Sequence, residues 1–295
     1  MARKQRRNWG VTLAIIPFWI LVLGAYVGTM LWTVFISLTS SKMLPNTEFV
    51  GLAQYERLFA TERWGIAVHN IVVFGLLMMT LCLVLGFILA AMLDSKIRAE
   101  DTVRTIILYP HAISFIVTGL VWQWMMNPTV GFEKAMHDFG WTGFAFDWLV
   151  VPDKAIYVLV LAGVWQGSGL IMALMLAGLR GIDQEIWKAA RIDGIPTWRV
   201  YLSIVLPMLR PTIITAVVLM SLAVIKAYDL VVALTNGGPG LSTDVPAKFI
   251  MDFLFERSNI GLATAACTMM LLFVLLVFTP WFYFEYFREK GHGQS

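Results

Sequence analysis

Residues 181–211, GIDQEIWKAARIDGIPTWRVYLSIVLPMLRP, decide the fold because they are charged although long apolar segments flank them on both sides. Seven side chains of this stretch carry a charge: Asp183, Glu185, Lys188, Arg191, Asp193, Arg199 and Arg210. One charged side chain at the centre of a bilayer already costs about 3 kcal/mol or more. We therefore expect the stretch to lie outside the membrane, in water or against another protein.

The pattern within this stretch predicts two short helices. Asp183 is a suitable N-cap, and Glu185 in the first turn suits the positive end of the helix dipole. Gly194 can adopt the left-handed conformation that ends a helix. Thr197 is then expected to cap a second helix, which runs into Leu206-Pro207. A loop with this much internal structure favours a docking surface over a linker.

The composition is typical of an integral membrane protein. Of the 295 residues, 59% are hydrophobic and 14% are charged, whereas soluble domains have about 45–50% and about 25%. The net charge of +3 is too small to indicate nucleic-acid binding. Cys82 and Cys267 lie within apolar segments, which argues against a disulfide framework. The four histidines, too far apart to suggest a metal site, are His69, His111, His137 and His292.

Six apolar segments of about 20 residues or more are each long enough to cross about 30 Å of hydrocarbon. They cover approximately residues 11–38, 66–93, 105–126, 155–179, 212–235 and 262–284. The first is too long for the apolar part of a cleaved signal peptide, about 7–15 residues. The sequence therefore predicts an all-α integral membrane fold. A cytoplasmic N-terminal segment (1–10) precedes a single transmembrane domain (11–295), whose core covers about 66–285.

Lysine and arginine residues are distributed unevenly between the two sides of these segments. Fourteen of the 22 fall in the N-terminal segment, the second-to-third connection, the charged stretch with Arg180, and the C-terminal tail. Those of the N-terminal segment are Arg3, Lys4, Arg6 and Arg7. Because positively charged loops favour the cytoplasmic face, we expect both termini and residues 181–211 to lie inside (N-in/C-in).

Residues 245–257, in an outer loop, have an amphipathic pattern. Apolar residues recur there at helical spacing: Phe249, Ile250, Phe253 and Leu254. Charged residues stand between them: Lys248, Asp252 and Glu256. The pattern predicts a helix that lies at the membrane surface or caps a cavity, or one that only covers the edge of the bundle.

The sequence contains none of the common motifs of nucleotide-binding or hydrolytic enzymes. The glycine cluster at 237–240 continues Leu-Ser-Thr and lacks the lysine of a phosphate-binding loop. H-E-x-x-H, G-x-S-x-G and paired-cysteine motifs are also missing. Transport is therefore a better hypothesis than catalysis for a bundle that carries polar residues inside its apolar segments.

Lys226 and Asp229 are the charged residues of the fifth apolar segment. Three positions apart on one helix, they would share a face. They would then either form an ion pair that fixes helix packing or line a water-filled path for a polar solute. Further polar candidates for such a path are Tyr228, Asn236, Gln123 and Gln166. Trp124 and Trp165 beside the glutamines suit sugar stacking, but tryptophans near membrane interfaces are more often anchors than ligands.

The charged stretch resembles a known motif. Residues 185–194 (EIWKAARIDG) and 204–211 (IVLPMLRP) resemble the EAA motif of ATP-binding-cassette (ABC) importer permeases. Residues 229–239 and 261–266 resemble the carbohydrate branch of that family. The similarity covers about residues 10–285 and is greatest to permeases related to the larger maltose permease and the first glycerol-3-phosphate permease.

This resemblance implies a type I ABC importer permease with six transmembrane helices, in the inner or plasma membrane of a prokaryote. It implies a second, homologous permease subunit, two cytoplasmic ATPase subunits and an extracytoplasmic binding protein that delivers a sugar. ATP and Mg would be held by the ATPase subunits, and this chain would have no ATPase site and bind no cofactor. Closure of the ATPase dimer would move the short cytoplasmic helices and open the pathway to the other side.

The resemblance also implies which residues couple the chain to the ATPase subunits. They are Glu185, Ile186, Lys188, Ala189, Ala190, Asp193, Gly194, Leu206 and Pro207. The alanines permit close approach, and Ile186 with Trp187 offers apolar contact area. One position departs from the family, because Lys188 stands where a glutamate usually precedes the alanine pair. The role of that carboxylate is therefore open in this chain.

Alternative functions are compatible with the same residues. The chain would transport glycerol phosphate or another polyol if Lys226 contacted an anionic group. It would be a non-transporting membrane subunit if residues 181–211 only bound a cytoplasmic partner. A standalone secondary transporter is disfavoured by this folded loop.

Overall fold

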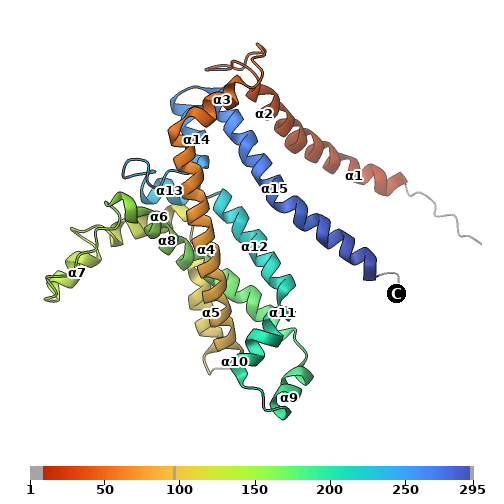
Figure 1. Ribbon diagram of the computed structural model, residues 1–295, viewed down its shortest axis with the longest axis vertical. Coiled ribbons are helices and arrows are strands. Elements are labelled where there is room, and N and C mark those ends of the chain that lie inside the picture. The colour runs from red at the N-terminus through yellow and green to blue at the C-terminus, as the bar shows by residue number, and fades with distance from the viewer. Residues whose placement is uncertain (1–8, 96–97, 293–295) are drawn as a thin grey trace, which may run out of the picture. The chain divides into compact units, whose positions relative to one another are not determined.

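The computed structural model describes residues 9–95 and 98–292, and within these the regular secondary structure is helical. The predicted basic cluster Arg3, Lys4, Arg6 and Arg7 lies outside the described residues. The described part has three helices long and apolar enough to cross a membrane, or up to five spans if each bent helix pair is one. The chain divides into two compact units, Met1–Glu62 with Phe249–Ser295, and Arg63–Lys248 (Figure 1).

The smaller unit is built around the last helix, α15 (Ile260–His292). Its other helices are α1 (Trp9–Leu21), the π-helix η1 (Val22–Gly28), α2 (Thr29–Ser37), α3 (Ala53–Ala60) and the π-helix η4 (Asp252–Glu256). Helices α2 and α3 pack against α15. A Cβ atom on Gly261 would lie 3.0 Å from the carbonyl oxygens of Thr39 and Ser41, so glycine is needed where α15 begins.

The larger unit contains the remaining helices. Those of the membrane segments are α4 (Glu62–Asp94), α5 (Glu100–Leu108), the 3-10 helix η2 (Tyr109–Ala112), α6 (Phe115–Met125), α8 (Pro152–Arg180), α12 (Arg210–Ile225) and α13 (Tyr228–Leu234). Those of the connections are α7 (Phe132–Asp138), α9 (Gln184–Ile192), α10 (Thr197–Val200), the π-helix η3 (Tyr201–Val205) and α11 (Leu206–Met208). Helix α8 supplies much of the apolar core of this unit.

Helices α4 and α8 approach each other closely along a stripe of small residues. Three matched pairs form the stripe: Met78 with Gly163, Cys82 with Gly167, and Gly86 with Ile171. Within each helix these positions are four residues apart, and the numbers rise together, so the two helices run parallel. Small residues allow such close approach between membrane helices. The ends of α4 and α8 at Asp94 and Arg180 therefore lie on the same side of the unit.

Two predicted spans are not continuous helices, which corrects the sequence-based expectation. The third span is bent by 98° between α5 and α6, with Pro110 in the intervening 3-10 turn. Proline lacks the N–H group that an α-helix interior needs, so the change from α-helix to 3-10 helix at Pro110 has a local cause, and the bend follows at Ile113, whose backbone is extended. The fifth span is interrupted at Lys226 and Ala227, between α12 and α13.

This second interruption overturns the predicted arrangement of Lys226 and Asp229. The two residues do not share one continuous helix, since Lys226 follows the end of α12 and Asp229 belongs to α13. Among the ion pairs of the described residues, none joins them. A structural ion pair is therefore not the reason for these two charges.

The predicted amphipathic helix at 245–257 is present as α14 (Pro246–Met251) followed directly by η4. Phe249 and Phe253 are buried and stack at 4.4 Å between ring centroids. Lys248 and Asp252 are also buried. The predicted helix is confirmed.

We predict that Gly86→Val destabilises the larger unit. The new Cβ atom would lie 2.7 Å from Ile171 Cγ2 and 3.0 Å from the Met172 backbone nitrogen. Overpacking of this kind costs about 1–3 kcal/mol. Thermal unfolding of the purified protein in detergent measures the change. Gly65→Ala in the same helix is the control, because no atom lies within 4 Å of its new Cβ; equal loss in both variants would contradict the prediction.

Candidate functional site

Helix α9 is the first of the two short helices predicted within 181–211, and it begins as expected. Asp183 is the N-cap, and its Oδ1 accepts a hydrogen bond of 2.9 Å from the backbone N–H of Glu185. Glu185 lies in the first turn, where its negative charge suits the helix dipole. The side chains that the sequence pattern selected for the beginning of this helix therefore have the predicted roles.

The end of α9 is also defined by local hydrogen bonds. Gly194 has φ +68°, the left-handed conformation in which glycine is favoured. The N–H groups of Asp193 and Ile195 donate to the carbonyl groups of Ala189 and Ala190, both at 3.0 Å. The N-cap of the second short helix lies one residue earlier than predicted: it is Pro196, and Thr197 is the first helical residue.

One side of α9 is attached to the larger unit. Ala190 is buried, and Ile186 and Trp187 are half-buried against the unit's apolar core. Trp187 meets Tyr201 edge-to-face at 5.3 Å between ring centroids, and Tyr201 meets Phe87 of α4 at 6.1 Å. These three rings connect the short helix to a membrane segment. The apolar area expected of Ile186 and Trp187 is therefore partly used within the chain itself.

The other side of α9 is open and combines charged with apolar groups. Glu185, Lys188, Ala189, Arg191 and Asp193 are exposed. Beside them Ile192 is 85% exposed and Trp198 is 61% exposed. Sequence reasoning missed these two as surface residues, because their exposure depends on how α9 turns against α10. Exposed apolar side chains among charged ones make this side of α9 and α10 a candidate protein-binding surface.

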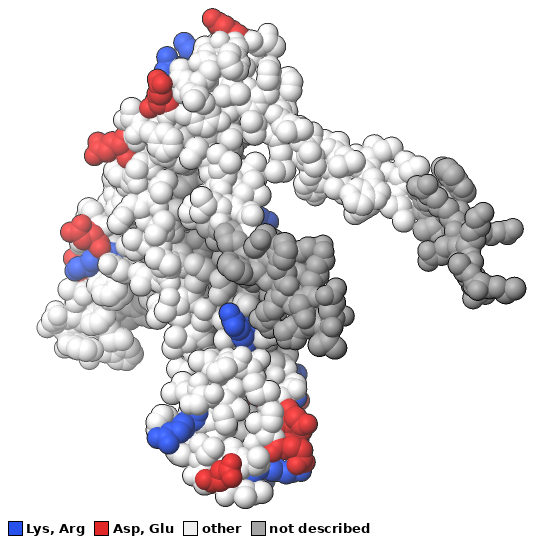
Figure 2. All heavy atoms as spheres, turned by 45° about the vertical axis from the view of Figure 1, so that its right-hand side comes forward, with Lys and Arg blue, Asp and Glu red and all other residues white. Residues whose placement is uncertain are grey.

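Figure 2 shows this mixture of charges at the end of the larger unit where Figure 1 places α9 and α10. Lys188 contributes to it through an ion pair with Glu185, with 2.8 Å between Nζ and Oε1 and both side chains largely exposed. An exposed pair within one helix contributes about 0.3–0.5 kcal/mol. The charge of Lys188 is thus partly neutralised within its own helix.

The second short helix continues through η3 and α11 before the chain bends by 70° into α12. Leu206 is half-buried and Pro207 is exposed at this bend. Leu209, the residue between α11 and α12, is buried. The two predicted coupling residues therefore lie where the 181–211 segment turns toward the next apolar helix.

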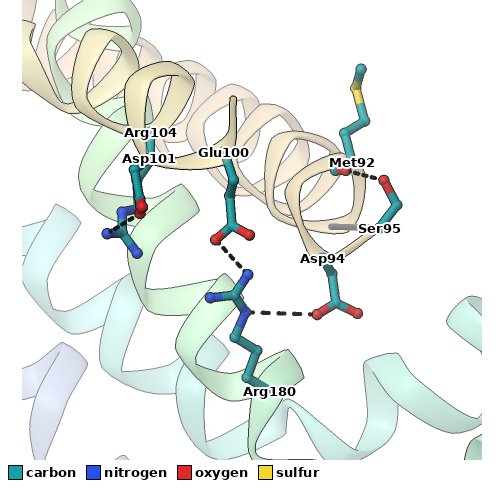
Figure 3. Close-up of polar contacts among 7 residues, drawn as sticks. All are labelled: Met92, Asp94, Ser95, Glu100, Asp101, Arg104 and Arg180. Carbon is teal, nitrogen blue, oxygen red and sulfur yellow. Dashed lines mark hydrogen bonds and ion pairs between the residues drawn. The ribbon is translucent and has the colours of Figure 1, made fainter. Parts of the chain in front are cut away.

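An ionic cluster lies at the end of α8, where the chain continues toward α9 (Figure 3). The sequence pattern did not indicate this cluster. Arg180, the last residue of α8, donates from Nη2 to Glu100 Oε1 at 2.5 Å. Its Nε is 3.9 Å from Asp94 Oδ1. Because Glu100 begins α5 and Asp94 ends α4, one guanidinium group connects the ends of three helices.

A second cluster holds the loop after α13 against the beginning of α4. Arg63 donates to Asp244 from Nε at 2.6 Å and from Nη2 at 3.3 Å, and the Asp244 side chain is only 1% exposed. Asn70 Nδ2 donates to the carbonyl groups of Leu241 and Asp244 at 3.0 and 2.9 Å. The partners are more than 170 residues apart in sequence, so no local signal indicates them.

The predicted solute-path residues differ in environment. Gln166 is 3% exposed and donates from Nε2 to the Ile113 carbonyl at 2.6 Å, at the bend between α5 and α6. Its Oε1 has no hydrogen-bond partner among the described residues. Gln123 in α6 is half-buried. The nearby rings of Trp122 and Trp165 meet edge-to-face at 6.0 Å.

The other four path candidates lie at the two ends of α13. Lys226 and Asp229 are exposed and Tyr228 is half-buried at its beginning. Asn236 is exposed just beyond its end, with φ +51°. α13 packs against α6, and a Cβ atom on Gly119 would lie 2.6 Å from Ala233 Cβ. The packing brings the elements that carry Gln123 and Asp229 together, whereas Gln166 contacts the bend before α6.

We predict that Asp244→Ala lowers the stability of the protein. The substitution removes a buried carboxylate that accepts two hydrogen bonds from Arg63. Removing one partner of a buried ion pair costs about 3–5 kcal/mol. Thermal unfolding in detergent measures the loss. Asp147→Ala is the control, because its pair with Lys154 is exposed and 3.4 Å long; an Asp244→Ala protein as stable as the control would disprove the role of this pair.

Known proteins resemble most of the chain. Residues 102–284 match the family model described as the binding-protein-dependent transport system inner membrane component. A probable ABC transporter permease protein of Pyrococcus horikoshii is 38% identical over 288 residues, 95% of this chain and 97% of that protein. The xylose/arabinose import permease protein XacH of Haloferax volcanii is 32% identical, with 94% of this chain and 86% of that protein covered.

A solved structure shares the fold. It is the bacterial alginate ABC transporter in complex with a periplasmic protein that holds an alginate pentasaccharide. One of its chains superposes with a TM-score of 0.79 over 92% of this chain and 93% of that chain. At 20% sequence identity the likeness concerns the fold alone.

Proposed function

We propose a function that follows from the chain's family: the chain belongs to the inner membrane components of binding-protein-dependent transport systems. It is a multi-pass inner membrane protein and a permease subunit of an ABC importer, as the motif at 185–211 predicted. We propose that the importer is driven by ATP and carries a sugar, and that this chain forms half of the solute pathway.

The single observation that carries this proposal is the folded surface around α9. Its helix is capped at both ends by the chain itself, and one side is attached to the core by Ala190 and Trp187. The opposite side presents Ile192 and Trp198 together with charged residues. A rigid helix with an open apolar patch suits a partner protein that must transmit force rather than only tether the chain.

The partners that we propose are a second, homologous permease, two cytoplasmic ATPase subunits and an extracytoplasmic solute-binding protein. ATP and Mg would bind at the ATPase subunits, because the sequence of this chain lacks a phosphate-binding loop. The alginate transporter with its periplasmic protein supports the binding-protein partner. In this assignment the chain has no ATPase site of its own.

A sugar is the solute class that we propose. The named pentose permease of Haloferax volcanii is 32% identical along nearly the whole chain and supports it. The polar candidates on or beside the two interrupted spans would face the solute: Gln166, Gln123, Lys226, Tyr228, Asp229 and Asn236. Discontinuous membrane helices provide free backbone groups and helix ends, which suit polar ligands.

The mechanism that we propose starts with movement of the ATPase subunits against α9. Because the helix ends at Gly194 and is anchored through Ala190, displacement of α9 would be passed on to η3 and α11. The 70° bend before α12 then provides the place where the cytoplasmic segment turns into the membrane. The two permeases would alternate between inward-facing and outward-facing states as the ATPase dimer closes and opens.

We predict that the complete complex, reconstituted in proteoliposomes with its binding protein, takes up a labelled sugar only when ATP is enclosed with the ATPase subunits. Labelled xylose, arabinose, maltose and glycerol 3-phosphate are compared. Accumulation driven by an ion gradient without ATP would contradict the ATP-driven assignment. Uptake of glycerol 3-phosphate alone, abolished by Lys226→Ala, would replace the sugar with an anionic polyol.

We predict that Ile192→Glu weakens binding of the ATPase subunits about 10-fold or more, the effect expected of a central apolar contact. ATPase retention on the immobilised permease pair measures it, and ATP-driven uptake should fall in parallel. Phe139→Glu is the matched control, because Phe139 is 87% exposed on the α7 connection. Equal ATPase retention by the two variants would place the docking surface elsewhere.

A further inference from the structure

We propose that α4 connects the α9 segment mechanically to the outer loop 237–244, with Arg180 and Asn70 as positioning residues at its two ends. The inference rests on the proposed importer function, and deepens it by naming the element that transmits the movement. It depends on three observations: a clamp at each end of α4, and continuity between them.

The inner clamp is the Arg180 cluster. Figure 3 shows the Arg180 guanidinium group pointing between Glu100 and Asp94, which reach it from α5 and α4. Arg180 directly precedes the segment that contains α9, so it connects that segment to α4 by charge as well as through the backbone of α8. An ion pair exposed to this degree contributes little stability. This ion pair is therefore informative because of the helix ends that it joins, and not because of its contribution to stability.

A second contact at the same end of α4 is aromatic. Phe87 of α4 meets Tyr201, and Tyr201 meets Trp187 of α9, both edge-to-face. Phe87 lies seven residues before Asp94, about two helical turns, so the ionic and aromatic contacts hold the same end of α4. Movement of α9 relative to this end would have to break the aromatic contact or take α4 with it, while Arg180 holds the beginning of the α9 segment at the same place.

The outer clamp is the Asp244 cluster. Asn70 donates two hydrogen bonds to backbone carbonyl groups of the 237–244 loop, and Arg63 holds the Asp244 carboxylate. Within the loop, Thr243 Oγ1 lies 2.7 Å from Thr235 Oγ1 and donates to the Gly238 carbonyl at 2.8 Å. The loop is therefore a hydrogen-bonded body whose position is set by α4.

α4 differs from the other helices that could transmit movement through the larger unit, because it is long and unbroken. It is one helix of 33 residues, about 50 Å long. The route through α5 and α6 is bent by 98°, and the route from α12 to α13 is interrupted at Lys226. α8 is also continuous, but the chain on its outer side leads to the α7 connection and not to the 237–244 loop. Close packing on α8 stiffens α4 further.

The test uses the complete complex with a fluorophore on the outer loop. Leu241 is partly exposed, and only its backbone carbonyl is used in the clamp, so Leu241→Cys provides the labelling position. The parent chain without this cysteine controls for labelling of Cys82 and Cys267. ATP binding is triggered with a non-hydrolysable analogue, and the fluorescence change is compared with ATPase activity and subunit retention. No solute is needed for this signal.

We expect Arg180→Gln to reduce the ATP-dependent fluorescence change about 5-fold or more, with ATPase activity and subunit retention unchanged. Asp94→Asn removes the charge that Arg180 meets on α4, and it should reduce the signal in the same way. Arg104→Gln is the matched control, because Arg104 is equally exposed and its pair with Asp101 stays within α5. It should leave the signal intact.

The outer end is tested by Asn70→Ala, which should reduce the signal in the same way. The inference is overturned if Arg180→Gln or Asp94→Asn keeps the full signal, or if the unmodified complex shows no signal. Failure of the sugar assignment is distinguishable, since a complex that gives the signal but takes up no sugar would refute only the proposed solute.

Discussion

The close packing of α4 on α8 is the contact on which the larger unit depends. Gly86, Gly163 and Gly167 let the two helices approach until side chains meet backbone. In an apolar surrounding, where burying apolar area gains little, this close contact replaces the hydrophobic effect as the source of helix association. Because the helices run parallel, the same contact places Asp94 beside Arg180 and leaves the outer end of α4 for the 237–244 loop.

The charged residues of the unit gather at the ends of this helix pair. The inner cluster joins three helix ends through partly exposed groups, while the outer cluster buries Asp244 almost completely. The difference is physical: a buried carboxylate needs several hydrogen bonds to offset its lost hydration, and Arg63 provides two of them. The inner groups stay hydrated, which suits contacts that must change during a transport cycle.

Local chemistry made α9 predictable. Asp183 and Gly194 define its two ends through bonds to residues at most five positions away, and such short-range patterns can be read in one sequence. The breaks at Pro110 and Lys226 were less predictable, because an apolar segment with the right length looks the same whether its helix is straight or bent. Pro110 was a local signal for one of them.

The sequence by itself determined the membrane class, the places of the apolar segments and the folded loop at 181–211. The reasons are the length of each apolar segment, the free-energy cost of placing a charge in hydrocarbon, and helix capping. All three depend on residues that are close together in the sequence. Only the tertiary structure decided that Trp187 and Ile186 turn inward, that Ile192 and Trp198 face outward, and that Arg63 meets Asp244. These arrangements depend on which helix faces pack together, and residues far apart in the chain meet only after that packing is complete.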